Sequence, residues 1–240
     1  MEYIYIALIG LSAGTVKGYS GFGSSLVAIP LLRILYGEIT TEHIAILVAF
    51  SLVLNTLLLV ENKGFHPESL KRVWLIPLFG VIFTFVGIQV LFSVSGDVLG
   101  YIAGSFIILA ILNKVFGFRV KLHDTPFTRI VVGALSGIGN GIASIDGPPV
   151  VIYLTSINAP KVQFKNVLAA HFLVMGVVAV GIHLFSGSYT IDGLMLLGMM
   201  LICTAVGLFI GMFLSRRSNE KVFQQVILVI MFGLAISLFL

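Results

Sequence analysis

The sequence predicts an all-α integral membrane protein that is built as an inverted repeat. Hydrophobic residues make up 58% of the 240 residues and charged residues only 10%, so the chain has more apolar surface than a soluble core can bury. Several apolar runs reach the roughly 20 residues that a helix needs to cross a bilayer, and they lack the alternation of barrel strands. Two glycine-rich stretches, residues 10–30 and 133–153, carry glycines at matching positions, which indicates a duplication.

Each half of the chain is predicted to contain a broken, re-entrant helical hairpin followed by three transmembrane helices. The first half, residues 1–118, has a hairpin at about 3–36, made of segments 3–16 and 22–36, and helices at 43–60, 73–92 and 98–118. The second half, residues 130–240, has a hairpin at about 130–157, made of segments 130–142 and 148–157, and helices at 165–185, 189–214 and 221–240. A polar linker, residues 119–129, joins the halves.

The number of crossings makes the two halves inverted. Each half crosses three times if its hairpin is re-entrant and five times if the short segments also cross, and both numbers are odd. Which of the two holds stays open. Of the 14 Lys and Arg residues, Arg33 falls on one face and Lys17 in the first break, and all others fall on the opposite face. Those others are Lys63, Lys71, Arg72, Lys114, Arg119, Lys121, Arg129, Lys161, Lys165, Arg216, Arg217 and Lys221.

Basic residues gather on the cytoplasmic side of membrane proteins, so this distribution predicts an orientation. The linker is expected in the cytoplasm and both termini outside it. The expected location is the cytoplasmic (inner) membrane, which the chain crosses several times.

The two breaks point to a binding site for an anion. Non-helical backbone at membrane depth is tolerated where it lines a watery cavity, and paired breaks in inverted halves mark the substrate site of transporters. The second helix of each hairpin is expected to begin near Ser24 and Ser25 in one half and at Pro148 and Pro149 in the other, because proline suits a first helical turn. Two helix N-termini would then meet, and their positive ends favour an anion.

Two charged residues accompany the breaks. Lys17 lies in the first break, where a cation is costly unless it meets a partner or a substrate, and Asp146 occupies the equivalent zone of the second. Lys17 is a candidate substrate ligand, and Asp146 a candidate for gating or proton coupling. The alternatives are a structural ion pair between them, or a Lys17 side chain that reaches the surface.

Small and polar residues around the breaks complete the candidate site. Their alternative role is close helix packing. His171, within an apolar helix, is a second candidate for gating or proton coupling, and its alternative is an interhelical hydrogen bond. The candidate substrate-binding residues besides Lys17 are Ser20, Gly21, Gly23, Ser24, Ser25, Asn140, Ser144, Gly147 and Pro148.

The sequence predicts no cofactor and no metal site. Cys203 is the single cysteine, so there is no thiol pair for metal or redox chemistry. The expected partners are a small anionic substrate and the lipid bilayer, with no nucleic acid. A coupling ion, proton or sodium, and the oligomeric state stay open.

Two segments carry a resemblance to a known family. GYSGFGSSLVAIPLL in the first half and SGIGNGIASIDGPPVVIYL in the second resemble the paired glycine-rich signatures of the sulfite exporter TauE/SafE family, also called the 4-toluene sulfonate uptake permease family. The resemblance covers essentially the whole chain. It implies movement of a small anion, such as sulfite, an organosulfonate or a related organic acid, by a secondary mechanism without ATP. Together with the inverted repeat it leads us to expect a transporter that works by alternating access, not an enzyme. Asp146 departs from the family pattern, in which glycine is common before Gly-Pro-Pro.

The sequence is also compatible with two other functions. An anion channel would use the same breaks, and saturable exchange across the bilayer would distinguish a carrier from it. A rhomboid-like intramembrane serine protease would use Gly18-Tyr19-Ser20-Gly21 as its nucleophile motif and His171 as the base. The protease has no use for an inverted duplication, whereas alternating access uses it directly.

Overall fold

The computed structural model describes residues 2–61, 68–71, 73–95, 97–99, 101–102, 104–105, 122–157, 159 and 161–217. Within these ranges all regular secondary structure is helical, and four helices are long and apolar enough to cross a bilayer. These spans are Thr41–Val60, Leu75–Ser93, Asn166–Phe185 and Ile191–Ser215. The chain is therefore an all-α, multi-pass integral membrane protein, as its composition predicts.

The helices begin and end close to where hydropathy places them. They are α1 (Glu2–Ser20), α2 (Ser24–Tyr36), α3 (Thr41–Glu61), α4 (Glu68–Lys71), α5 (Leu75–Ser93), α7 (Pro126–Ala143), α8 (Gly147–Ser156), α9 (Lys161–Phe185) and α10 (Ile191–Arg217). Most of the predicted helix 98–118, linker residues 119–121 and the predicted helix 221–240 lie outside the described residues. Lys63, Arg72, Lys114, Arg119, Lys121 and Lys221 also lie outside them, so the orientation stays a prediction.

Two details of the predicted elements are wrong. α1 continues to Ser20 instead of ending near residue 16, so Lys17 lies in the last helical turn and not in the break. A lysine is compatible with a helix, and its charge is favourable near the negative C-terminal end. The short helix α4 was not expected, because a single turn outside the apolar segments leaves no hydropathy signal.

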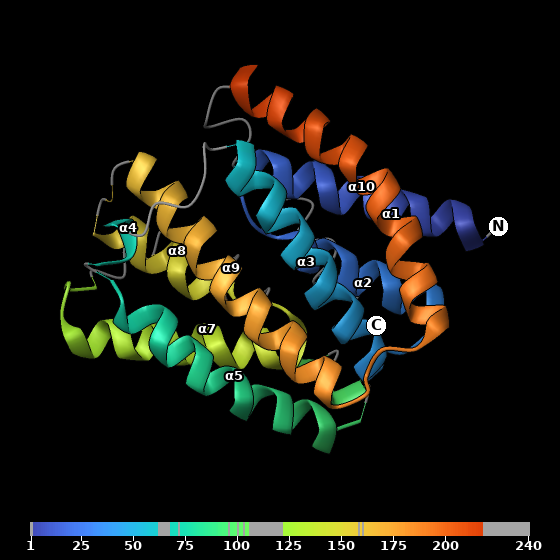
Figure 1. Ribbon diagram of the computed structural model, residues 1–240, viewed down its shortest axis with the longest axis horizontal. Helices are drawn as coiled ribbons and strands as arrows, with labels where there is room; N and C mark the ends of the chain where they lie inside the picture. Colours follow the sequence, from blue (N-terminus) through green and yellow to red (C-terminus); the bar gives the residue numbers. More distant parts are fainter. Residues whose placement is uncertain are drawn as a thin grey trace.

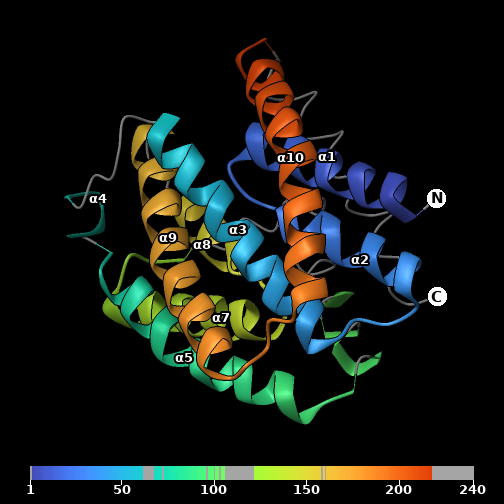
Figure 2. The ribbon, with the colours of Figure 1, turned by 45° about the vertical axis from the view of Figure 1, so that its right-hand side comes forward.

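The helices pack as a central pair between two flanking pairs (Figures 1 and 2). α3 and α9 lie side by side in the centre. On one side α1 lies along α10, and on the other side α7 lies along α5. Each flanking pair therefore joins one helix from the first half of the chain to one from the second half.

Glycines bring the helices of both flanking pairs into backbone contact. A Cβ atom on any of six glycines would lie only 2.2–2.6 Å from a carbonyl oxygen of the neighbouring helix, so no larger residue fits. In each pair the three glycines follow one another at intervals of four residues, which places them on one helix face. The contacts are Gly10 with Met200, Gly14 with Thr204 and Gly18 with Leu208, and Gly133 with Ile76, Gly137 with Gly80 and Gly141 with Thr84.

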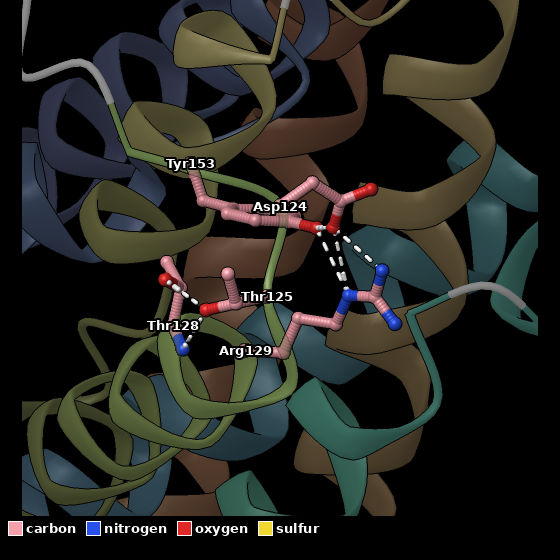
Figure 3. Close-up of polar contacts among 5 residues, drawn as sticks. All are labelled: Asp124, Thr125, Thr128, Arg129 and Tyr153. Atoms are coloured by element: carbon pink, nitrogen blue, oxygen red, sulfur yellow. Dashed lines mark hydrogen bonds and ion pairs between the residues drawn. The ribbon is translucent and has the colours of Figure 1, made fainter.

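A polar cluster anchors the second hairpin to the end of the linker (Figure 3). Arg129 of α7 donates two hydrogen bonds to Asp124, from Nε at 2.8 Å and from the guanidinium NH2 group at 2.6 Å. The hydroxyl of Tyr153, on α8, donates to the same carboxylate oxygen. Thr125 caps α7 by accepting a hydrogen bond from the backbone N–H of Thr128. The cluster therefore fixes the outer ends of α7 and α8 to each other and to the linker.

Candidate functional site

Helices α1 and α7 end in the same way, and the ends form the two breaks. The N–H of Gly21 donates to the carbonyl oxygen of Lys17, and the N–H of Ser144 donates to that of Asn140, both at 2.8 Å. Gly21, with φ +81°, and Ser144, with φ 54°, adopt the left-handed conformation that ends an α-helix. Gly23 precedes α2 with φ 89°, a conformation in which a side chain would be strained.

A small cavity lies between the two breaks. The second helix of each hairpin begins there, α2 at Ser24, as predicted, and α8 at Gly147, one residue before the predicted Pro148. The first N–H groups of a helix have no partner within it, and they carry the positive end of the helix dipole. The predicted site residues that line the cavity are Lys17, Gly23, Ser24, Ser25, Ser144, Asp146, Gly147 and Pro148.

Lys17 is buried, with 3% of its surface exposed. Its Nζ atom lies 4.9 Å from the centre of the Phe172 ring, a cation–π contact that lowers the cost of a charge in this place. Among the described residues no nitrogen–oxygen contact of 4.0 Å or less joins Lys17 to Asp146. Both charged side chains therefore face the cavity without closing an ion pair across it.

Asp146 stands at the N-cap position of α8. Its side chain makes no capping hydrogen bond, although a carboxylate there is favoured by the helix dipole. Its backbone carbonyl oxygen accepts a hydrogen bond of 2.7 Å from the hydroxyl of Ser136. Ser136 of α7 thus fixes the backbone of the second break, while the side chain of Asp146 lines the cavity.

Four serine hydroxyls connect the two breaks. Ser25 donates to Ser144 at 3.2 Å, which joins the first hairpin to the second. The hydroxyl of Ser51, on α3, lies 3.1 Å from that of Ser24 and 3.5 Å from that of Ser25. This side of the cavity is therefore polar although it lies deep between apolar helices.

Some predicted site residues do not line the cavity. The single hydroxyl hydrogen of Ser20 is shared between the carbonyl oxygens of Val16, at 2.7 Å, and Phe22, at 2.6 Å, and so helps to shape the first break. Asn140 donates to Thr84 and to the carbonyl oxygen of Met175, at 3.4 Å each, and thereby connects α7 to α5 and α9.

Gly21 and His171 also lie outside the cavity lining. Gly21 forms the turn that ends α1. The ring of His171 is hydrogen-bonded to Ser136. Ser20 and His171 therefore have separate partners, and the described residues do not form the pair that the protease alternative requires.

Sequence reasoning missed Ser51 and Phe172, which both line the cavity. The signal for Ser51 was a polar residue in an apolar helix one turn before Asn55, whose side chain donates to the carbonyl oxygen of Phe172. Phe172 carries no such signal, since one phenylalanine among 19 is indistinguishable from the others until the fold brings α9 to the cavity. Phe22, Leu26 and Ile145 complete the apolar part of the lining.

Comparison with known families identifies the chain over nearly its whole length. The family model described as "Sulfite exporter TauE/SafE" matches residues 6–238. No curated protein and no solved structure matches the chain. The match spans both glycine-rich segments and the cavity between them. The chain therefore belongs to the sulfite exporter TauE/SafE family and is a membrane transporter.

Proposed function

We propose that the chain is a secondary transporter of a small anion, such as sulfite, an organosulfonate or a related organic acid, and that the anion binds in the cavity between the two breaks. The observation that carries the proposal is Lys17, a buried cation that lines a cavity at two helix N-termini and forms no close ion pair with Asp146. A charge in this position is costly unless a partner arrives, and an anionic substrate is such a partner.

The cavity offers donors as well as charge. A hydroxyl has one hydrogen, so Ser25, which donates to Ser144, must accept from Ser51, and Ser51 must then accept from Ser24. In this order Ser144 is an acceptor, and its own hydroxyl hydrogen has no acceptor among the described residues, so it can donate into the cavity. Backbone N–H groups at the start of α2 add further donors, whereas at the start of α8 Gly147 supplies one and the next two residues, Pro148 and Pro149, have no N–H.

Asp146 opposes a second negative charge in the same cavity. Its carboxylate lies at the start of α8, so the anion is expected nearer to Lys17 and to the start of α2, where no acidic residue lines the cavity. Neutralising Asp146 by a proton would remove the repulsion. Asp146 is thus the proposed gating or proton-coupling residue, with a proton as the coupling ion.

The packing of the helices supports a mechanism of alternating access. We propose that residues 1–118 and 130–240 are two inverted repeats joined by a cytoplasmic linker, with both termini on the other side of the cytoplasmic membrane. The first helix of each repeat packs on the other repeat, α1 on α10 and α7 on α5. Movement of one repeat against the other would open the cavity to each side in turn.

Uptake by proteoliposomes tests the proposal. Lys17→Met keeps the volume of the side chain and removes its charge, so uptake of radiolabelled sulfite is expected to fall by about 10–100-fold, the range for a lost charge-assisted hydrogen bond. Arg33→Gln is the matched control, because Arg33 lies in the last turn of α2, away from the cavity, and pairs with Asp97. Its uptake should stay near that of the wild type. Unchanged uptake by Lys17→Met would refute the anion role.

The same assay separates a carrier from a channel. A carrier saturates with substrate and exchanges labelled for unlabelled anion, because each cycle moves one bound substrate. In a channel the uptake rate rises in proportion to the anion concentration, and no exchange of labelled for unlabelled anion is coupled to a transport cycle. Sulfite, ethanesulfonate and acetate, added as competitors, rank the substrate classes.

A further inference from the structure

His171 begins a hydrogen-bonded chain that ends at the second break. The side chain is completely buried on α9, with 0% of its surface exposed. Its Nε2 atom lies 2.8 Å from the hydroxyl oxygen of Ser136 on α7, and that hydroxyl lies 2.7 Å from the backbone carbonyl oxygen of Asp146. Three separate parts of the fold are thus connected by two hydrogen bonds.

The direction of the two bonds follows from the groups that form them. A carbonyl oxygen only accepts, so the single hydrogen of the Ser136 hydroxyl is donated to Asp146. The oxygen of Ser136 must therefore accept from His171, which places a proton on Nε2. The other ring nitrogen, Nδ1, is buried and has no hydrogen-bond partner among the described residues. A second proton on Nδ1 would have no acceptor, so the chain of bonds specifies a neutral ring.

We propose that His171 is a positioning residue, a neutral donor that holds the Asp146 carbonyl through Ser136 and so fixes the start of α8 at the cavity. The inference rests on the proposed function and gives His171 a role other than that of a proton carrier. The positioning acts on the backbone of the break, because the bond ends at a carbonyl oxygen and not at the carboxylate.

Nitrogen NMR of histidine-labelled full-length protein tests the protonation state without reference to transport. His171→Gln identifies the resonances of the ring among those of five histidines. At neutral pH we expect a proton on Nε2 and none on Nδ1. A ring protonated at Nδ1, or at both nitrogens, would overturn the proposal.

Substitutions test the positioning role. The amide nitrogen of glutamine reaches the place of Nε2 and that of asparagine the place of Nδ1, so only His171→Gln can donate to Ser136. We expect His171→Gln to take up sulfite within about threefold of the wild type, and His171→Asn and Ser136→Ala to lose about tenfold, the value of one buried hydrogen bond. A glutamine cannot carry a proton through the cycle, so equal losses in His171→Gln and His171→Asn would refute the role.

Two readouts keep this inference distinct from the proposed function. A wild-type chain that takes up none of the tested anions would count against the proposed function, whereas the NMR result would still decide the state of His171. Ser136→Ala and His171→Asn act on one chain of bonds, so the double variant should lose no more uptake than either single variant. Additive losses would contradict the shared chain.

Discussion

Ser51 is the residue through which the central helix α3 reaches the cavity. Its hydroxyl accepts from Ser24 and donates to Ser25, so Ser51→Ala breaks the chain of hydroxyls that orders Ser25 and Ser144. The loss of about 1 kcal/mol predicts a KM for sulfite that is about fivefold higher, with little change in the maximal rate. Concentration-dependent uptake measures both constants.

The control for Ser51→Ala is Ser93→Ala. Ser93 is exposed, and its hydroxyl donates only within its own helix, to the carbonyl oxygen of Gln89. Its KM should equal that of the wild type. The same KM in both variants would show that the hydroxyl chain does not contribute to binding.

Charged residues of the site could be predicted from the sequence, but their surroundings could not. Lys17 and Asp146 stand out because each interrupts an apolar stretch, and the structure places both at one cavity. Asn140 is equivalent to Lys17 by sequence offset, yet its amide reaches Thr84 and Met175 instead of the cavity. Which way a polar side chain points depends on the neighbouring helices, and these are not adjacent in the sequence.

At the scale of the helix, the contact between α1 and α10 depends on Gly14. A Cβ atom there would lie 2.4 Å from the carbonyl oxygen of Thr204, a backbone atom that cannot move without separating the helices. Gly14→Ala is therefore expected to lower the free energy of unfolding by about 1–3 kcal/mol, the cost of overpacking. Thermal unfolding of the purified protein in detergent measures the change.

Gly198, on α10, is the matched control because a Cβ atom there would meet nothing within 4 Å. Gly198→Ala should leave the unfolding temperature unchanged or raise it slightly, since alanine is the better helix former. If Gly14→Ala and Gly198→Ala changed the unfolding temperature equally, close packing against α10 would not be the reason for a glycine at position 14.

The cluster in Figure 3 predicts a second effect on stability. Tyr153→Phe removes the hydroxyl that donates to Asp124 in a partly buried site and should lower the free energy of unfolding by about 1 kcal/mol. Tyr5→Phe is the control, because Tyr5 is 54% exposed. Denaturation curves of the two variants would coincide if the cluster did not stabilise the hairpin.

Helix positions could be predicted well because each apolar segment carries its own signal. The ends could not be predicted equally well. Lys17 and Gly18 together look like the end of a segment, but Gly18 serves the contact with Leu208 and the helix runs on to Ser20. A glycine that packs against a neighbour and a glycine that ends a helix are the same letter in the sequence.

At the scale of the whole molecule, alternating access requires the two repeats to move against each other at their central contact. An ideal Cβ on Gly176 of α9 lies 3.3 Å from the Cβ of Leu52 on α3, close to the separation in a disulfide. In a Cys203→Ser background, Leu52→Cys combined with Gly176→Cys is expected to form a cross-link that abolishes uptake, and reduction should restore it.

The two single-cysteine variants, in the same background, serve as controls for this cross-link. Neither should respond to oxidation, because each lacks a partner thiol. Full uptake by a protein shown to be cross-linked would rule out relative motion of α3 and α9 in the transport cycle.

The partners of the flanking helices could not be predicted from the sequence. The matching glycines predict that α1 and α7 each pack closely against another helix. The same glycine pattern allows close approach of any helix, so it does not identify the partner. Only the fold shows that α1 meets α10 and α7 meets α5. The repeat itself stays a prediction that depends on the spacing of the glycines alone.

The contact between α1 and α10 also sets an order of events during synthesis. The hydroxyl hydrogen of Thr204 is shared between the carbonyl oxygen of Met200, 2.6 Å away on the same helix, and that of Gly10, 2.9 Å away and 194 residues earlier in the chain. At roughly 5–20 residues per second, α10 leaves the ribosome about 10–40 s after α1. Throughout that interval α10, which packs on the glycine face of α1, has not yet been made, so α1 is synthesised well before this contact can form.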